Sequence, residues 1–232
     1  MLCYICENKI TLNKEIIITS DGSHTIFVPD LNETYHSRHG AIQESAHVYI
    51  KEGFDFISSK NELSILEVGF GTGLNAIMTF IANTEVKRRV KFTSLEANPL
   101  EWELVSQLNY FSNNSDSLES KIFAEMHSCS WGKYCQISSF FSLKKLNLKL
   151  QKVFYDTEFD LIYFDAFAPQ IQPELWTKVI FESMFKSLVS GGILVTYCAK
   201  GNVKRVLKSV GFDIESIAGP PGKRQMTRAI KR

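Results

Sequence analysis

Long hydrophobic runs are missing from this chain. No stretch of about eighteen apolar residues occurs in its 232 residues, so a transmembrane helix is not expected. The first residues lack a basic segment followed by an apolar one, which argues against a secretory signal and favours a cytoplasmic location. Cysteine is also scarce. Five cysteines are an odd number in a chain of this length, which argues against a disulfide framework. Cys3-x-x-Cys6 is half of a zinc motif without a second half, so we predict no metal site.

An excess of charge of one sign is missing as well. Lys and Arg total 26 and Asp and Glu total 25. The distribution is nevertheless uneven, because residues 198–232 carry nine basic and only two acidic side chains. Such a basic end can bind a polyanion or can be a solvated tail, and charge alone leaves both readings open. The hydrophobic fraction of 44% is high enough for a full core, which excludes wholesale disorder.

The first sixty residues differ in pattern from the rest. Two short β-rich runs, residues 15–19 and 24–28, flank the turn signal Ser20-Asp21-Gly22-Ser23, which predicts a hairpin. Residues 40–52 have apolar side chains at helical spacing. We therefore expect residues 1–60 to form an annex and residues 61–232 to form the main domain.

Strand and helix patterns alternate from residue 61 onward. This alternation predicts an α/β fold with a mostly parallel, seven-stranded sheet covered by helices on both faces. The expected strands are residues 64–68, 90–95, 146–150, 159–164 and 193–197 with two more at the end, and the expected helices are residues 74–82, 100–111, 117–126, 173–188 and 203–210. Sheets of this kind bind ligands at the carboxyl ends of their strands.

A glycine loop follows the first of these strands. Its spacing, Gly69-x-Gly71-x-Gly73, differs from the G-x-G-x-x-G of pyrophosphate binders, although a glycine triplet alone can be a plain strand–helix turn. Glu67 precedes the loop, and a carboxylate there would repel a pyrophosphate. It would suit a ligand with a cationic end, such as the sulfonium or amino group of S-adenosylmethionine.

Two further acidic residues end predicted strands. Glu96 follows the second strand, where a carboxylate can accept hydrogen bonds from both hydroxyls of a ribose. Asp165 follows the fourth strand, where such sheets place reacting groups, and Phe167 and Pro169 form an apolar lip beside it. The competing interpretations are a surface glutamate and a loop or N-cap aspartate.

With these residues assembled, the chain resembles the class I methyltransferases and, more narrowly, the MnmC-type tRNA wobble-uridine methyltransferase domain. The glycine loop is generic to methyltransferases, whereas the later motifs are specific. The matching stretches are Asp21-Gly22-Ser23, Tyr35-His36-Ser37, Gly40-Ala41, Glu44-Ser45, Gly69 to Asn75, Asp165 to Pro169, Pro173 to Trp176, Thr196-Tyr197 and Gly219 to Arg224.

The resemblance implies a Rossmann-like class I fold and an activity that N-methylates the 5-aminomethyl group of 2-thiouridine at tRNA position 34. S-adenosyl-L-methionine would be the cofactor, held by the glycine loop with Asn75 and by Glu67 and Glu96. Asp165 would be the proton acceptor, with Glu44 and Tyr35 as further catalytic candidates. The tRNA anticodon loop would contact Phe167, Lys223 and Arg224, and Arg228, Lys231 and Arg232 would extend this basic surface.

In many bacteria the domain is fused to a flavin-dependent oxidoreductase. This chain ends before one, so the resemblance implies a stand-alone form served by a separate oxidoreductase partner. One departure concerns the adenine. Family members often have an acidic residue after the third strand, where this sequence reads Asn147-Leu148-Lys149-Leu150. The sequence therefore assigns no adenine-binding residue there.

Three alternatives remain open at this point. The first is a methyltransferase acting on a small molecule or protein, which would not need the basic end. The second is an NAD-dependent Rossmann oxidoreductase, which the glycine spacing and Glu67 disfavour. The third is a tRNA-binding module with a decayed cofactor site, which the intact acidic and glycine positions disfavour.

Overall fold

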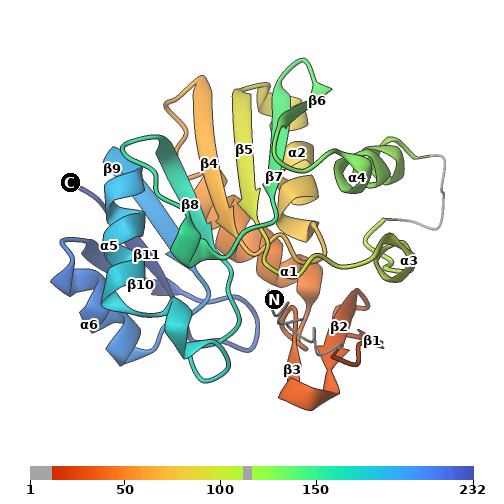
Figure 1. The fold of residues 1–232 in the computed structure, drawn as a ribbon, viewed down its shortest axis with the longest axis horizontal. Helices are drawn as coiled ribbons and strands as arrows, with labels where there is room; N and C mark the ends of the chain where they lie inside the picture. The colour runs from red at the N-terminus through yellow and green to blue at the C-terminus, as the bar shows by residue number, and fades with distance from the viewer. Residues whose placement is uncertain (1–11, 112–116) are drawn as a thin grey trace, which may run out of the picture.

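A central eight-stranded sheet organises the computed structural model, which describes residues 12–111 and 117–232 (Figure 1). The strand order is β10-β11-β9-β8-β4-β5-β7-β6. The strands are β4 (Glu62–Val68), β5 (Arg89–Leu95), β6 (Tyr134–Ser138), β7 (Phe141–Leu146), β8 (Phe159–Phe164), β9 (Leu188–Thr196), β10 (Asp213–Ala218) and β11 (Gln225–Ile230). The five strands from β9 to β7 are parallel to one another, whereas β6, β10 and β11 run antiparallel to their neighbours. The mostly parallel sheet is confirmed, with β6 as an additional edge strand.

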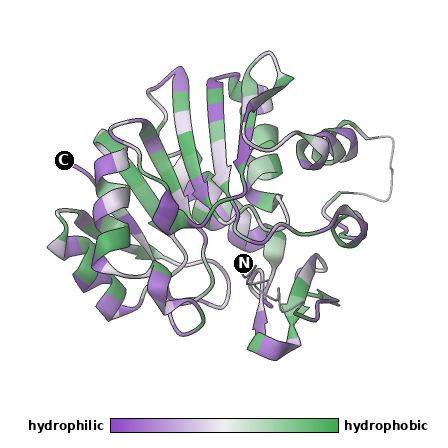
Figure 2. Cartoon of the chain, in the orientation of Figure 1, coloured by the Kyte–Doolittle hydropathy of each residue, from purple (hydrophilic) through white to green (hydrophobic). Residues whose placement is uncertain are grey.

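Alternating side chains of the central strands build two hydrophobic cores, one on each face. In β4, Leu63 and Ile65 belong to one core, and Leu66 and Val68 belong to the other. Long hydrophobic stretches in the strands are visible in Figure 2. The first core is covered by the helices α2 (Leu74–Val86), α4 (Leu118–Ser128) and η2 (Ala46–Phe54), and the second by α5 (Lys178–Ser187) and α6 (Gly201–Ser209). The expected covering of both faces is therefore confirmed.

The annex contains a small sheet and a helix that leads into the main domain. Strands β1 (Glu15–Ile18), β2 (His24–Val28) and β3 (Glu33–Thr34) confirm the expected hairpin and lie below the ends of β4 and β5 in Figure 1. Helix α1 (Ala41–Ser45) starts against the hairpin turn. There Ser23 Oγ accepts the Ala41 amide at 3.1 Å, and Asp21 Oδ2 accepts the Gln43 amide at 3.1 Å. The turn therefore caps the helix. The helix continues as the π-helix η2, which is wider than the α-helix that the spacing predicts.

Three predicted elements differ from the structure. The third parallel strand is β7 and not residues 146–150. Its buried side chains alternate as Phe141, Leu143 and Lys145, and the pattern is hard to recognise in the sequence because one of the buried residues is a lysine. The segment after it forms the short 3-10 helix η3 (Leu150–Lys152). Residues 100–111 contain only the one-turn helix α3 (Trp102–Val105).

Tertiary contacts explain the shortness of α3. Asn109 Oδ1 accepts the His24 amide at 2.6 Å, and Asn109 Nδ2 donates to the Gly22 carbonyl at 2.9 Å. These bonds tie the segment to the annex and take the place of helical hydrogen bonds.

The helix expected from residue 173 to 188 is interrupted at Thr177, which caps a new helix. A 3-10 turn, η4 (Pro173–Leu175), precedes Thr177, whose side chain accepts the Ile180 amide and begins α5.

None of the helices in the described ranges is long and apolar enough to span a membrane. The described part of the chain also has no group of three or more metal-ligating side chains. Cys3 and Cys6 lie outside the described residues.

Candidate active site

A cavity of about 770 Å³ opens at the carboxyl ends of β4, β5 and β8. This is where ligands bind in open α/β sheets. Its wall combines segments that are far apart in the sequence, namely the annex segment 33–39 with Glu44, the glycine loop, residues 95–98, residues 148–151, residues 165–168 and Lys223. The annex therefore forms one side of a cavity whose floor belongs to the main sheet.

The glycine loop and Glu96 form one end of the cavity. Gly71 donates its amide to Glu96 Oε2 at 3.0 Å, and the Asn98 amide donates to Glu96 Oε1 at 2.8 Å. Each carboxylate oxygen accepts one of these bonds, so acceptor capacity remains on a side chain that lines the cavity. A Cβ atom at Gly71 would lie 3.2 Å from the Tyr35 ring, which is a tight contact, and the φ angle of +49° there also favours glycine. The structure thus brings Glu96, Gly69, Gly71 and Tyr35 together in one cavity.

Glu67 and Gly73 are placed differently from the prediction. Glu67 is fully buried and is absent from the cavity wall, because its side chain points to the same face of β4 as Ile65. It accepts a hydrogen bond from Ser94 Oγ, and its Oε1 has no partner in the described residues. Burial raises the pKa of Glu67 well above its usual range. The expectation that Glu67 faces a cationic ligand is therefore not met. Gly73 does not line the cavity either and lies directly before α2.

Asp165 is the centre of a hydrogen-bond network that joins the sheet to the annex helix. Tyr49 Oη donates to Asp165 Oδ1 at 2.5 Å, and Asn75 Nδ2 donates to Asp165 Oδ2 at 2.8 Å. Ser45 Oγ in turn donates to Asn75 Oδ1 at 2.7 Å. A carboxylate has about four acceptor positions, so Asp165 is held by two donors and can still accept two more from the cavity.

The surroundings of Asp165 shift its titration towards neutrality. Burial is the main cause and raises the pKa of Asp165 to about 7, with the Glu44 charge adding to the rise. The hydrogen bonds from Tyr49 and Asn75 and the Lys223 charge oppose it. A group that gains and loses a proton near neutral pH is suited to general acid–base chemistry.

A second carboxylate lines the same cavity. Glu44 is buried, accepts the Ser37 amide at 2.7 Å and pairs with Lys223 Nζ at 2.6 Å. Tyr35 and Phe167 form an aromatic wall in which the ring centroids are 5.1 Å apart and the planes are nearly perpendicular. The predicted residues Asp165, Glu44, Tyr35 and Phe167 therefore share one cavity.

The sequence interpretation missed two tyrosines of the site. Tyr49 is fully buried in η2, and Tyr197 donates its hydroxyl to the Ala166 carbonyl at 2.9 Å and packs its ring against Lys223. A signal for Tyr49 existed, because Ser45 and Tyr49 are one helical turn apart and both reach the network. For Tyr197, its place just after β9 was the signal.

The basic end of the sequence is divided in space. Arg224 is exposed on the turn beside the cavity. Arg228, in contrast, is buried and paired with Glu52 and Glu215. Lys231 donates to the Leu188 carbonyl and Arg232 pairs with Asp213, at the end of β11 remote from the annex (Figure 1). The predicted inclusion of these last three residues in a phosphate-binding surface at the site is therefore wrong, because an antiparallel strand carries them away from the carboxyl ends.

Residues 114–232 match the family model described as S-adenosyl-L-methionine-dependent methyltransferase. The chain belongs to this family. The methyltransferase fold and the cofactor expected from the sequence are thereby confirmed, and the NAD-dependent oxidoreductase is excluded.

Similar proteins carry a more specific name. The bifunctional protein MnmC of tRNA 5-methylaminomethyl-2-thiouridine biosynthesis from Cupriavidus metallidurans is 28% identical over 93% of this chain and 33% of its own length. That from Aromatoleum aromaticum is 28% identical over 94% of this chain and 35% of its own length. The crystal structure of MNMC2 from Aquifex aeolicus superposes with a TM-score of 0.79 at 26% identity, covering 96% of this chain and 72% of that one. The methyltransferase chain thus spans about a third of the curated relatives it matches.

The cavity of this methyltransferase fits its cofactor. The Glu96 carboxylate suits a ribose, and the close-packed glycine loop leaves room for a ligand where side chains would otherwise intrude. Leu148 and Leu150 give an apolar wall beside Asn98, with no carboxylate after β7, in agreement with the sequence. The base would thus be held by apolar contact and by polar groups such as Asn98.

Replacing Tyr49 with phenylalanine should move the pH dependence of methyl transfer. The Tyr49 hydrogen bond lowers the pKa of Asp165, so its loss raises that pKa and a larger hydroxide concentration is needed to ionise the carboxyl. A hydrogen bond to a charged group is worth roughly 1.5 to 3 kcal/mol. We therefore expect the rising limb of kcat/KM, near pH 7 in the unmodified enzyme, to shift upward by about one pH unit.

The control is Tyr163→Phe, which removes another buried hydroxyl on the same face. Tyr163 contacts Thr79 Oγ1 at 3.2 Å and makes no hydrogen bond to Asp165. If the rising limb of kcat/KM against pH were the same in the Tyr49→Phe variant as in the unmodified enzyme, Tyr49 would neither position nor polarise Asp165.

Proposed function

We propose that this methyltransferase transfers a methyl group to the 5-aminomethyl group of 2-thiouridine at tRNA position 34, giving 5-methylaminomethyl-2-thiouridine. The observation that carries the proposal is the pair of carboxylates, Asp165 and Glu44, in one aromatic-walled cavity next to the cofactor loop. Carboxylates suit an amine acceptor. The names of the relatives give the same modified nucleoside.

The roles of the residues follow from the chemistry of an amine acceptor. S-adenosyl-L-methionine supplies a methyl group on a positively charged sulfur, which a neutral amine nitrogen attacks with release of S-adenosylhomocysteine. Asp165 accepts a hydrogen bond from the amine and takes the proton that the ammonium form of the substrate must lose before its nitrogen can attack, so that the product leaves as a secondary ammonium. Tyr49 and Asn75 fix the carboxylate while it does so. Glu44 and Tyr35 orient the amine, and the cavity limits the access of water.

The annex of residues 1–60 would act as a cap over the main domain of residues 61–232. Its segment from Glu33 to His39 lines the cavity. Phe167, which contacts Tyr35, offers a ring face on which a base turned out of the anticodon loop can stack. Packing at Gly222 joins the annex to the C-terminal turn, because a Cβ there would overlap the His39 ring and the φ angle is +82°. The base would therefore enter between fixed walls.

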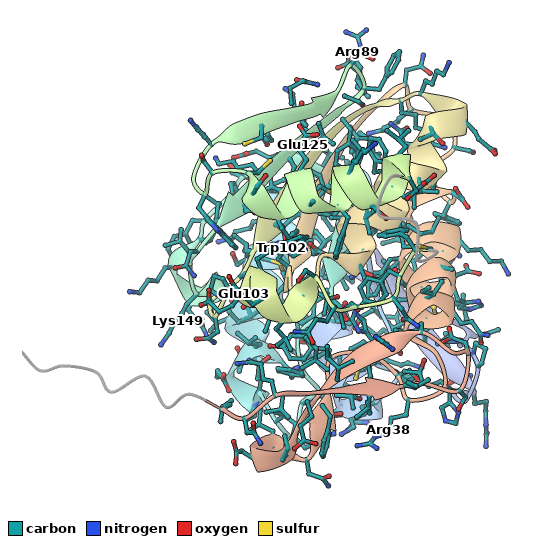
Figure 3. The ribbon with its side chains drawn as sticks, turned by 90° about the vertical axis from the view of Figure 1, so that its right-hand side faces the viewer. Arg38, Arg89, Trp102, Glu103, Glu125 and Lys149 are labelled. Carbon is teal, nitrogen blue, oxygen red and sulfur yellow. The ribbon has the colours of Figure 1, made fainter. Side chains whose placement is uncertain are left out.

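Phosphates of the anticodon loop would lie on the cationic rim of the cavity. Arg38 and Lys149 are exposed, line the cavity mouth and extend away from the ribbon in Figure 3, and Arg224 is exposed on the nearby turn. The aminomethyl substrate must come from another activity. A separate flavin-dependent oxidoreductase is the partner that we propose.

Charge reversal on this rim should weaken tRNA binding. The double variant Arg38→Glu with Lys149→Glu should lower affinity at least about tenfold, and the slope of log affinity against log salt should fall in magnitude by roughly 1.5, since each lost phosphate contact removes about 0.7 to 0.9. Filter binding across a salt series measures both quantities. Arg89→Glu with Lys91→Glu is the matched control, because it makes the same charge change at the other end of the sheet (Figure 3). Equal losses in the two double variants would mean that the rim has no special part in binding.

Nucleoside mass spectrometry tests the function itself. The enzyme and S-adenosyl-L-methionine are incubated with tRNA bearing 5-aminomethyl-2-thiouridine, and the digest should gain one methyl at that nucleoside. Retention of the unmethylated nucleoside, together with methylation of a small amine or a protein, would replace the proposal with the small-molecule or protein alternative.

A further inference from the structure

The Lys223 side chain occupies part of the cavity. Its ammonium is 2.6 Å from Glu44 Oε1 and 4.0 Å from the centroid of the Tyr197 ring. About a third of the lysine side chain is exposed, whereas the Glu44 side chain is 9% exposed. The sequence interpretation treats Lys223 as a ligand of tRNA phosphate, but in the structure its ammonium faces a buried carboxylate.

A carboxylate beside an aromatic face is a receptor for ammonium groups. The carboxylate supplies a charge-assisted hydrogen bond and the ring face attracts the cation. Lysine ends in a primary ammonium on a methylene group, which is also the end of a protonated 5-aminomethyl side chain. We propose that Glu44 and Tyr197 form the subsite that receives the ammonium of the substrate, and that Lys223 fills this subsite until a polynucleotide draws it out. This proposal rests on the function proposed above and adds how the amine is selected.

The position of this subsite next to the proton acceptor supports the assignment. The Tyr197 hydroxyl donates to the carbonyl of Ala166, the residue after Asp165. The charges of Glu44 and Lys223 both act on Asp165, in opposite directions. An amine bound between Glu44 and Tyr197 is therefore within the field of the group that must take its proton.

The place of Lys223 in the chain allows it to leave. It lies on the turn between β10 and β11, next to the exposed Arg224, and its flexible stem carries the ammonium from that turn into the cavity. A phosphate at the cavity rim is a second anion with which the Lys223 ammonium can pair. When an RNA substrate binds, Lys223 therefore moves from Glu44 to a phosphate, and the substrate ammonium pairs with Glu44. A free nucleoside has no phosphate and must compete with the lysine. The device therefore favours a base carried on RNA.

The test measures binding of 5-aminomethyluridine, as a nucleoside without phosphate, by calorimetry with saturating S-adenosylhomocysteine. Lys223→Ala should bind it at least about tenfold more tightly than the unmodified enzyme, because a subsite filled nine-tenths of the time lowers apparent affinity by that factor. Lys223→Gln, which also removes the cation, should show a gain in the same direction. Lys223→Arg keeps a resident cation and should bind as weakly as the unmodified enzyme.

Three controls complete the experiment. Lys186→Ala removes an exposed lysine on α5 and should leave the affinity unchanged. Uncharged 5-hydroxymethyluridine should not gain affinity in Lys223→Ala. Adding Glu44→Gln to Lys223→Ala should erase the gain for the amine.

Unchanged or weaker binding of the amine by both Lys223→Ala and Lys223→Gln would overturn the subsite. This outcome is distinct from failure of the proposed function. A gain in amine affinity with no methylation of tRNA by the unmodified enzyme would support the subsite and refute the wobble-uridine substrate. Methylation of tRNA without any gain in amine affinity in the variants would support the wobble-uridine substrate and refute the subsite.

Discussion

Replacing Asp165 with alanine should lower the rate of methyl transfer about a thousandfold. The Asp165 side chain lines the cavity and is fixed by two side-chain donors, Tyr49 and Asn75. Loss of a positioned proton acceptor costs between about 100- and 10,000-fold in comparable reactions. Single-turnover kinetics with saturating cofactor measure the step directly.

Cofactor binding supplies the control for this variant. Affinity for S-adenosylhomocysteine should change only a few-fold in Asp165→Ala, because Glu96 and the glycine loop remain. Turnover equal to that of the unmodified enzyme would remove Asp165 from the mechanism. A parallel loss of cofactor affinity would instead assign Asp165 to binding.

A methyl group on Gly69 should abolish most of the cofactor affinity. Gly69 has a φ of +95°, which favours glycine, and an added Cβ would lie 2.7 Å from the backbone carbonyl of Asp165. The strand-end loop must then move away from Asp165, which disturbs the Gly71 amide and its bond to Glu96. The loss of one or two such interactions corresponds to roughly a hundredfold weaker binding in Gly69→Ala.

Gly132 is a close match for the control. Its φ is +89°, but an added Cβ would meet nothing within 4 Å. Gly132→Ala therefore introduces the same backbone strain without the collision, and should cost about 1 kcal/mol of stability with unchanged cofactor affinity. Similar calorimetric affinities for the two variants would refute the close-approach explanation.

The mostly parallel sheet and the place of the site could be predicted from the sequence. Alternating apolar residues in strands such as residues 64–68 and 159–164 specify which face each side chain meets, and the parallel arrangement brings Gly69, Glu96 and Asp165 to one edge. The same alternation, counted two residues on from Ile65, places Glu67 on the face of Ile65 and away from the cavity. The sequence contained that information, but the charge of Glu67 suggested a ligand contact.

Other parts depend on contacts between distant segments. The π-helical winding that carries Tyr49 to Asp165 has no signature in apolar spacing. The pairing of Lys223 with Glu44 joins residues at opposite ends of the chain, and burial of Arg228 between Glu52 and Glu215 depends on how β11 packs. A count of basic residues cannot distinguish an internal cation from one that faces solvent.

The central claim is that the methyl donor lies across the ends of β4, β5 and β8 with its sulfur beside Asp165. A crystal structure of the complex with S-adenosylhomocysteine tests it most directly. We expect both ribose hydroxyls on Glu96, the glycine loop against the ligand and the sulfur turned toward the Asp165 carboxylate. A ligand bound outside this cavity, or with its sulfur on the side away from Asp165, would contradict the account.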